Sequence, residues 1–230
     1  MKTVGLLGGM KWESTGHYYR LINVGVSQQA GGTHSTKIFL GSFDFDEIER
    51  LRTVGQRAEA VALLSRAADS LKGAGADYLV ICGNEMHSMA DDMTTPSAAS
   101  LLRITDAVGE ALQQQGLRRV GLLGPGFFVS EALDRRRLAE QFNLETCLPE
   151  TADQRVIDGI ICDELAHGVI NDTSRRTCLA VAQKLINQDL EGLILGCPEL
   201  TLIITSEDVA VPVFDSLEVH AGVIVKRLTV

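Results

Sequence analysis

The sequence predicts an α/β protein of two pseudo-symmetric lobes, each a parallel sheet flanked by helices. Three observations support this prediction. Short apolar runs alternate with longer amphipathic stretches along the 230 residues, the connections are short, and two strand-like motifs recur at nearly the same spacing. Alternating strands and helices with short connections are typical of parallel sheets that are covered on both faces. The recurrence indicates two lobes of similar construction.

The expected elements follow from hydrophobic patterning. The apolar runs predict strands at residues 3–7, 36–40, 78–82, 101–105, 120–123, 145–148, 192–195 and 211–214. The amphipathic stretches predict helices at 58–72, 106–115, 131–142, 153–167 and 174–188, and a further helix is expected after residue 15. In the first of these stretches, Val61, Leu64, Ala68 and Leu71 form one stripe at helical spacing. The charged segment 44–52 is expected to be a loop.

An internal repeat relates the two halves of the chain. The motif VGLLG at 4–8 recurs letter for letter at 120–124, and YLVICGNEM at 78–86 aligns with GLILGCPEL at 192–200. The two offsets, 116 and 114 residues, are too similar to assign to chance. We therefore expect an N-terminal lobe of residues 1–100 plus 210–230 and a C-terminal lobe of residues 101–209, related by a pseudo-two-fold axis.

Composition and charge narrow the possible partners. The chain is 45% apolar and 22% charged, which is ordinary for a globular protein. Its net charge of −9 disfavours nucleic acid and anionic membrane, although a locally positive site can still bind a small anion. No apolar run approaches the roughly 18 residues of a membrane span, and the start does not resemble a signal peptide. We expect a soluble, cytoplasmic protein.

The five cysteines are scattered and include no C-x-x-C pair. This pattern disfavours a disulfide framework and a zinc site, so we expect free thiols and no metal. Cys147, Cys162 and Cys178 match no repeat position and are expected to have no role in the site.

Ligands of open α/β sheets bind beyond the carboxyl ends of the strands. Two facing lobes would place segments 82–87 and 196–199 on opposite walls of one active-site cleft. Cys197 follows a predicted strand and precedes Pro198, which suits the first position of a helix. The positive end of that helix would favour a thiolate, so we expect a catalytic thiol; a buried apolar cysteine is the alternative.

The other strand end carries several polar residues. Cys82 aligns with Gly196 rather than with Cys197, and a one-residue displacement turns a strand side chain to the other face, so a core thiol is expected. Asn84 could bind a substrate carboxylate, and Glu85 could be a base or a helix-start carboxylate. His87 could orient a neighbouring group or be structural.

Three further features are weaker candidates. The glycines of segment 5–9 form either a tight turn or, with Ser14 and Thr15, a set of donors to a carboxylate. Arg50 or Arg52 could reach the site as a clamp for a distal carboxylate. The basic run 135–137 is expected to be a solvated helix face.

Taken in order, these motifs resemble those of the aspartate/glutamate racemase family. GGMKWEST at 8–15, the pair Tyr18 and Tyr19, LIN at 21–23, NEMH at 84–87, GCPE at 196–199 and PVFD at 212–215 look like that family's landmarks. The resemblance implies two α/β lobes, a homodimer, and a reaction needing no pyridoxal phosphate or other cofactor and no metal. It also implies a small acidic amino acid or dicarboxylate as ligand, with one thiol for each face of Cα.

The resemblance assigns roles residue by residue. Cys197 matches the second catalytic cysteine of the family. Met10, Asn84 and Glu199 match positions that lie near its substrate. On this basis Met10, Asn84 and Glu199 are expected to bind substrate. Arg52, as a clamp for the distal carboxylate, and His167 are also expected to bind it.

Three positions depart from the family pattern. Gly83 stands where the first catalytic residue is usually a cysteine and sometimes a threonine. Glu85 replaces a threonine that contacts the substrate carboxylate, and His167 replaces a lysine before the glycine of an E-L-x-x-G segment. A glycine beside one retained cysteine also resembles arylmalonate decarboxylase, where a single thiol delivers a proton to one face of an enediolate.

Three hypotheses remain open. An amino-acid racemase would use Cys197 on one face of Cα and Glu85 or water on the other, and this is the reading we favour. A lyase or decarboxylase would use Cys197 alone to protonate a carbanion. A non-catalytic carboxylate-binding protein would do neither. Deuterium exchange at Cα, change of substrate mass and binding without turnover distinguish the three.

Overall fold

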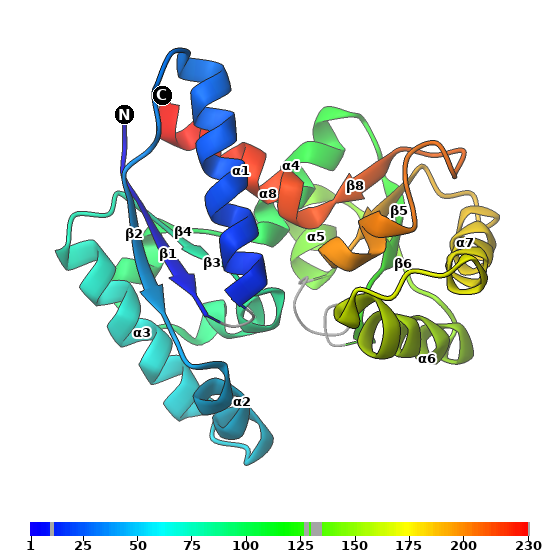
Figure 1. Ribbon diagram of the computed structural model, residues 1–230, viewed down its shortest axis with the longest axis horizontal. Helices are drawn as coiled ribbons and strands as arrows, with labels where there is room; N and C mark the ends of the chain where they lie inside the picture. The colour runs from blue at the N-terminus through cyan, green and yellow to red at the C-terminus, as the bar shows by residue number, and fades with distance from the viewer. Residues whose placement is uncertain (10–11, 127–128, 130–134, 230) are drawn as a thin grey trace. The chain divides into compact units, whose positions relative to one another are not determined.

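The computed structural model describes residues 1–9, 12–126, 129 and 135–229, except for the side chains of Glu49, Arg52, Thr53, Asn84 and Glu85. The chain divides into two compact units. Unit 1 comprises Met1–Arg103 and His220–Val230, and unit 2 comprises Ile104–Val219. Each unit contains a four-stranded sheet (Figure 1).

The sheet of unit 1 has the strand order β2-β1-β3-β4, and all neighbours are parallel. The strands are β1 (Val4–Gly8), β2 (Ile38–Ser42), β3 (Tyr78–Ile81) and β4 (Leu101–Leu102). Its helices include α1 (Trp12–Ala30), α2 (Phe45–Thr53), α3 (Arg57–Gly73) and the 3-10 helices η1 (Asn84–Asp92) and η2 (Pro96–Ser100).

Alternating residues of β1 face different helices. Leu7 packs in one buried cluster with Leu64 and Ala68 of α3. Gly8 lies so close to α1 that an added Cβ would come within 2.5 Å of the Thr15 side chain. Because successive strand residues point to opposite faces, α1 and α3 cover opposite faces of this sheet.

The sheet of unit 2 has the strand order β6-β5-β7-β8, again with parallel neighbours. The strands are β5 (Arg119–Leu123), β6 (Glu145–Cys147), β7 (Gly192–Leu195) and β8 (Val213–Asp215). Its helices include α4 (Ile104–Gln114), α5 (Arg135–Phe142), α6 (Thr151–Gly159) and α7 (Asp172–Ile186), and α8 (Ser216–Thr229) leads from unit 2 back into unit 1.

Consecutive residues of β7 face two separate clusters. Leu195 packs with Ile157 of α6 and Leu185 of α7. Ile194 packs with Val108 of α4 on the other face. The sheet of unit 2 is therefore also covered on both faces.

The two sheets confirm the predicted repeat. The order β6-β5-β7-β8 reproduces β2-β1-β3-β4 when each strand is moved four places along the chain. The repeated VGLLG motifs form most of β1 and β5. The second lobe boundary falls at residues 219/220 rather than at the expected 209/210, because β8 pairs with β7 and stays in unit 2.

The eight predicted strands are present, but three other expectations were wrong. The segment 44–52 is not a loop, since α2 occupies most of it, and Ile48 and Leu51 are buried against the α3 cluster. The strand expected at 101–105 ends at Leu102, because α4 begins at Ile104. The helix expected at 153–167 is α-helical only to Gly159, then passes through a π-helix and a short 3-10 helix.

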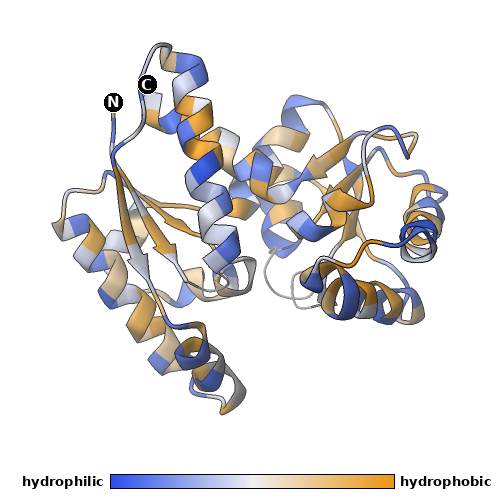
Figure 2. Ribbon diagram, viewed as in Figure 1, coloured by the Kyte–Doolittle hydropathy of each residue, from blue (hydrophilic) through white to orange (hydrophobic). Residues whose placement is uncertain are grey.

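Apolar residues concentrate on the strands of both sheets, whereas the helices also carry polar residues (Figure 2). No helix in the part of the chain that the structure describes is long and apolar enough to cross a membrane.

Candidate active site

Gly83 and Cys197 occupy corresponding positions in the two units. Each lies two residues beyond the last residue of a strand, Ile81 of β3 or Leu195 of β7. Each precedes a 3-10 helix, η1 in unit 1 and η6 (Pro198–Leu202) in unit 2. The backbone is extended at both, with φ −148° and ψ 119° at Gly83 and φ −150° and ψ 148° at Cys197.

The hydrogen bonds around these two residues also correspond. The carbonyl of Gly83 accepts from the N–H of Met86 at 3.1 Å, and that of Cys197 accepts from Leu200 at 3.3 Å. The structure therefore pairs Gly83 with Cys197, as the repeat predicts. Where unit 2 presents a thiol, unit 1 presents no side chain.

Cys197 lies in an apolar setting and is 6% exposed. It belongs to the buried cluster that includes Ile157 of α6 and Leu195 of β7. Burial raises the pKa of the Cys197 thiol well above its ordinary value, and the nearby, hydrogen-bonded Glu199 carboxylate raises it further. The thiol is therefore neutral near pH 7.

The expectation that a helix start would favour the Cys197 thiolate was wrong. The N–H groups of Glu199 and Leu200 do lower its pKa, as that reasoning requires. The helix η6 has only five residues, however, and loss of water together with a neighbouring negative charge outweighs its effect. The predicted position of Pro198 at the first residue of this helix is confirmed.

Cys82 is fully buried, and burial raises the pKa of its thiol. Its N–H donates to the Leu7 carbonyl at 2.8 Å, as Gly196 does to Leu123 at 2.7 Å in unit 2. Cys82 thus corresponds to Gly196 and is the expected core thiol.

Four of the predicted site residues cannot be placed by their side chains. Met10 lies outside the described residues. The side chains of Arg52, Asn84 and Glu85 also lie outside them, although the backbone assigns Arg52 to α2 and the other two to η1. Arg50, the alternative clamp, is an exposed residue of α2 rather than of a loop.

His87 has a structural environment. It is 6% exposed, and its Nε2–H donates to the Ile81 carbonyl at 3.0 Å. Its ring meets the His220 ring edge-on with centroids 5.6 Å apart. Burial, with a smaller effect of His220, lowers the pKa of His87 to about 3. His87 therefore ties the start of η1 to the end of β3 as a neutral side chain.

His220 also forms hydrogen bonds with residues of two other elements. Its Nδ1 forms a hydrogen bond with the Tyr18 hydroxyl at 2.8 Å, and its Nε2–H donates to the Leu102 carbonyl at 3.0 Å. Residues from α1, η1 and α8 thus secure the carboxyl ends of β3 and β4.

The glycine segment after β1 is a tight turn. Gly9 has φ +90°, and an added Cβ would come within 2.2 Å of the Phe43 carbonyl oxygen. Its N–H donates to Thr15 Oγ1 at 3.1 Å. Because the positive φ requires glycine and the N–H is used within the turn, the tight-turn alternative is supported at Gly9.

A model of the Asp/Glu/hydantoin racemase family matches residues 7–224. The chain belongs to this family. A crystal structure of a candidate Asp/Glu racemase from Yersinia pestis is 43% identical, with a TM-score of 0.96 and all of both chains covered. An aspartate racemase homologue from Pyrococcus horikoshii is 28% identical, with a TM-score of 0.85 and the same coverage.

A Gly74Cys mutant of arylmalonate decarboxylase shares the fold at 16% identity, with a TM-score of 0.55. The match covers 98% of this chain and 92% of that chain. The family-model match confirms the family that the sequence motifs resemble, and the similar structures confirm the two-lobed fold.

His167 lies exposed in the 3-10 helix Leu165–His167, directly before Gly168, which has φ +72°. Its substrate-binding role stays a prediction.

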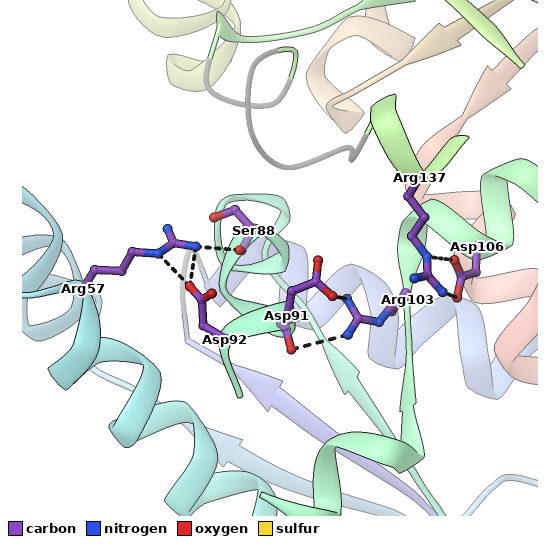
Figure 3. Close-up of polar contacts among 8 residues, drawn as sticks. Arg57, Ser88, Asp91, Asp92, Arg103, Asp106 and Arg137 are labelled. Atoms are coloured by element: carbon purple, nitrogen blue, oxygen red, sulfur yellow. Dashed lines mark hydrogen bonds and ion pairs between the residues drawn. The ribbon is translucent and has the colours of Figure 1, made fainter. Parts of the chain in front are cut away.

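The three arginines of the basic run 135–137 differ in their exposure to solvent. Arg135 and Arg136 are exposed, as expected for a solvated face. Arg137 is not, because it forms a two-pronged ion pair with Asp106 of α4 at 2.5 and 2.9 Å. Figure 3 shows this pair, and also the unit 1 bonds of Arg57 to Asp92 and to the Ser88 carbonyl.

No sequence pattern singled out Gln154 and Asp158 of α6. Their side chains bind the turn that follows β5, at the carboxyl end of the unit 2 sheet. Their spacing was the available signal. Gln154 and Asp158 are four residues apart, so they share one helix face with each other and with the apolar Ile157. Among the described residues, no group of three His, Cys, Asp or Glu side chains is placed to hold a metal ion.

Proposed function

We propose that this chain is a cofactor-independent amino-acid racemase that acts on a small acidic amino acid, with Cys197 transferring the proton at Cα. The observation that carries the proposal is the place of Cys197 at the carboxyl end of β7, beside Glu199 in an apolar setting. Strand ends of this kind are where open α/β sheets bind ligands.

The environment of Cys197 suits transfer of a proton to and from carbon. As a neutral thiol, Cys197 can donate its proton to a carbanion and become a thiolate. In the opposite direction, Glu199 is the adjacent acceptor for the thiol proton. A thiolate whose pKa is raised is a stronger base, which favours removal of the weakly acidic Cα proton.

Racemisation also requires a proton donor on the other face of the carbanion. Gly83, which corresponds to Cys197, supplies none. We therefore assign the second proton transfer to Glu85 or to a water molecule. The proposed substrate-binding residues remain Met10, Asn84, Glu199, Arg52 and His167. The family resemblance is the basis for proposing a homodimer, and the composition and cysteine pattern are the basis for proposing a cytoplasmic protein.

A second candidate is a lyase of decarboxylase type, and Gly83 is the observation that favours it. Loss of carbon dioxide from a substituted malonate leaves a carbanion that needs one proton on one face. Cys197 alone could supply that proton. A non-catalytic carboxylate-binding protein is the third outcome to be tested.

The deciding experiment follows both enantiomers of aspartate and glutamate in deuterium oxide. Loss of the Cα–H signal in proton NMR together with loss of optical rotation supports the racemase. Release of carbon dioxide from aryl- or alkylmalonates supports the lyase, and calorimetric binding without either change supports the binding protein. Cys162→Ser, which alters an exposed thiol, is the matched control for Cys197→Ser.

A further inference from the structure

Arg57 of α3 holds η1 through its backbone and through a side chain. Its Nη2 donates to the Ser88 carbonyl at 2.7 Å, and its Nε donates to Asp92 Oδ2 at 2.8 Å. Hydrogen bonds from a charged donor are stronger than neutral ones, and the planar guanidinium fixes their directions. Arg57 therefore holds the last two turns of η1 against α3.

Arg103 holds the same end of η1 from another element. It follows β4 directly, and its guanidinium donates to the Ala90 carbonyl at 3.4 Å and pairs with Asp91 at 2.5 Å. Its side chain is 22% exposed, so water screens this ion pair less than it screens a fully exposed one. Arg57 and Arg103 approach η1 from opposite sides (Figure 3).

The length of η1 makes such contacts necessary. It has nine residues, whereas η6, its counterpart in unit 2, has five. Hydrogen-bond geometry in a 3-10 helix is poor, and runs beyond about four residues are uncommon. Met86 and Met89 pack η1 into the α3 cluster, but apolar burial is not directional. The two arginines supply directional contacts at its end.

The start of η1 lies at the proposed site. Gly83 precedes it, and Asn84 and Glu85 are its first two residues. His87 ties this first part of η1 to the Ile81 carbonyl. A helix that is tied at its start and released at its end can tilt about the tied point, and such a tilt moves its first residues.

We propose that Arg57 and Arg103 are positioning residues of the racemase, which set the backbone of Asn84 and Glu85 by holding the end of η1. This inference rests on the proposed function. Neither arginine is assigned a contact with the substrate or with the reacting atoms. Misplacing a group in a site by about 1 Å can lower a rate about 10²-fold, so loss of either arginine should lower kcat.

The test measures kcat and KM of Cα exchange together with thermal unfolding. Arg57→Met and Arg103→Met keep an aliphatic stem and remove the donors. The matched control is Arg119→Met, because Arg119 also binds one carbonyl, that of Gln188, and one carboxylate, that of Glu145. Its contacts lie at the amino end of β5. We expect kcat to fall about tenfold or more in the two η1 variants and about twofold or less in the control.

Two further measurements separate positioning from a general loss of stability. Arg57→Lys keeps a charged donor for Asp92 and should recover part of the kcat that Arg57→Met loses. Amide hydrogen exchange within η1 should be faster in Arg57→Met than in the wild type, and unchanged in Arg119→Met.

Unchanged kcat in folded Arg57→Met and Arg103→Met would overturn the inference and leave the racemase intact. An equal fall in Arg119→Met, or no recovery in Arg57→Lys, would overturn it as well, since either result shows a general structural effect. The Arg57 side chain is 49% exposed, so Arg57→Met decides the question even if Arg103→Met does not fold. If the wild type does not exchange the Cα proton of an acidic amino acid, the proposed function fails and this inference fails with it.

Discussion

Gly83 and Cys197 share one backbone conformation at corresponding strand ends, so the two units differ there in chemistry and not in chain path. The correspondence extends to the hydrogen bond that each carbonyl accepts from three residues along the chain. At this pair of positions, unit 2 carries a thiol and unit 1 carries no side chain.

Gly83→Cys should increase racemisation and Cα exchange of an acidic amino acid. The backbone at Gly83 has a negative φ and is extended, a conformation that cysteine adopts readily. In the proposed racemase, the new thiol would supply the proton donor that is missing for the other face of the carbanion. Exchange in deuterium oxide and optical rotation measure the gain.

Circular dichroism of the Gly83→Cys variant confirms that it is folded before its rates are compared. A folded variant with no gain on either enantiomer of aspartate or glutamate would argue against a two-faced site for these substrates. That result would favour the lyase or the binding protein.

Cys197→Ser should abolish turnover while the fold is retained. Serine has nearly the same size, but its hydroxyl is a far weaker acid than a thiol, so the rate should fall by orders of magnitude. Thermal unfolding should be close to that of the wild type and of Cys162→Ser. Retained turnover would move the chemistry to another group, with Glu85 as the next candidate.

Glu199→Gln should lower the pKa of Cys197. The Glu199 carboxylate raises this pKa both through its charge and through its hydrogen bond with the thiol, and an uncharged amide removes the first effect. Thiolate absorbance near 240 nm, taken as the difference between each protein and its Cys197→Ser counterpart, isolates this thiol. A midpoint that stays unchanged or moves to higher pH would contradict the assigned role of Glu199.

The strands were predictable because each is a short apolar run, and because the internal repeat predicts corresponding strands in both halves of the chain. The helix α2 was not, although Phe45, Ile48 and Leu51 recur every three residues within it. Charged residues separate these positions, and a nine-residue helix depends on packing against α3 more than on its own propensity.

The place of Cys197 in the fold was predictable, but the pKa of its thiol was not. The position of Cys197 after a strand and before Pro198 follows from the neighbouring residues in the sequence. The raised pKa of its thiol does not, because burial depends on Ile157 and other residues distant in sequence. For the same reason no local pattern links His87 to His220, which lie 133 positions apart and meet only in the folded unit.

His87 should make the protein less stable as the pH falls below about 6.5. Burial and the facing His220 ring lower the pKa of His87 to about 3 in the folded state, with a smaller effect of Arg103. The unfolded chain, with a histidine pKa of about 6.5, therefore binds more protons between these two values. The stability that neutral His87 contributes is complete above pH 6.5 and decreases toward pH 3, by about 1.4 kcal/mol per pH unit. Urea unfolding from pH 7 to pH 4.5 measures this slope.

His87→Gln keeps a donor for the Ile81 carbonyl but cannot titrate, so its slope should be shallower than that of the wild type. His34→Gln, at an exposed histidine of the same unit, is the control. Parallel curves for the wild type and His87→Gln would show that another group causes the acid sensitivity.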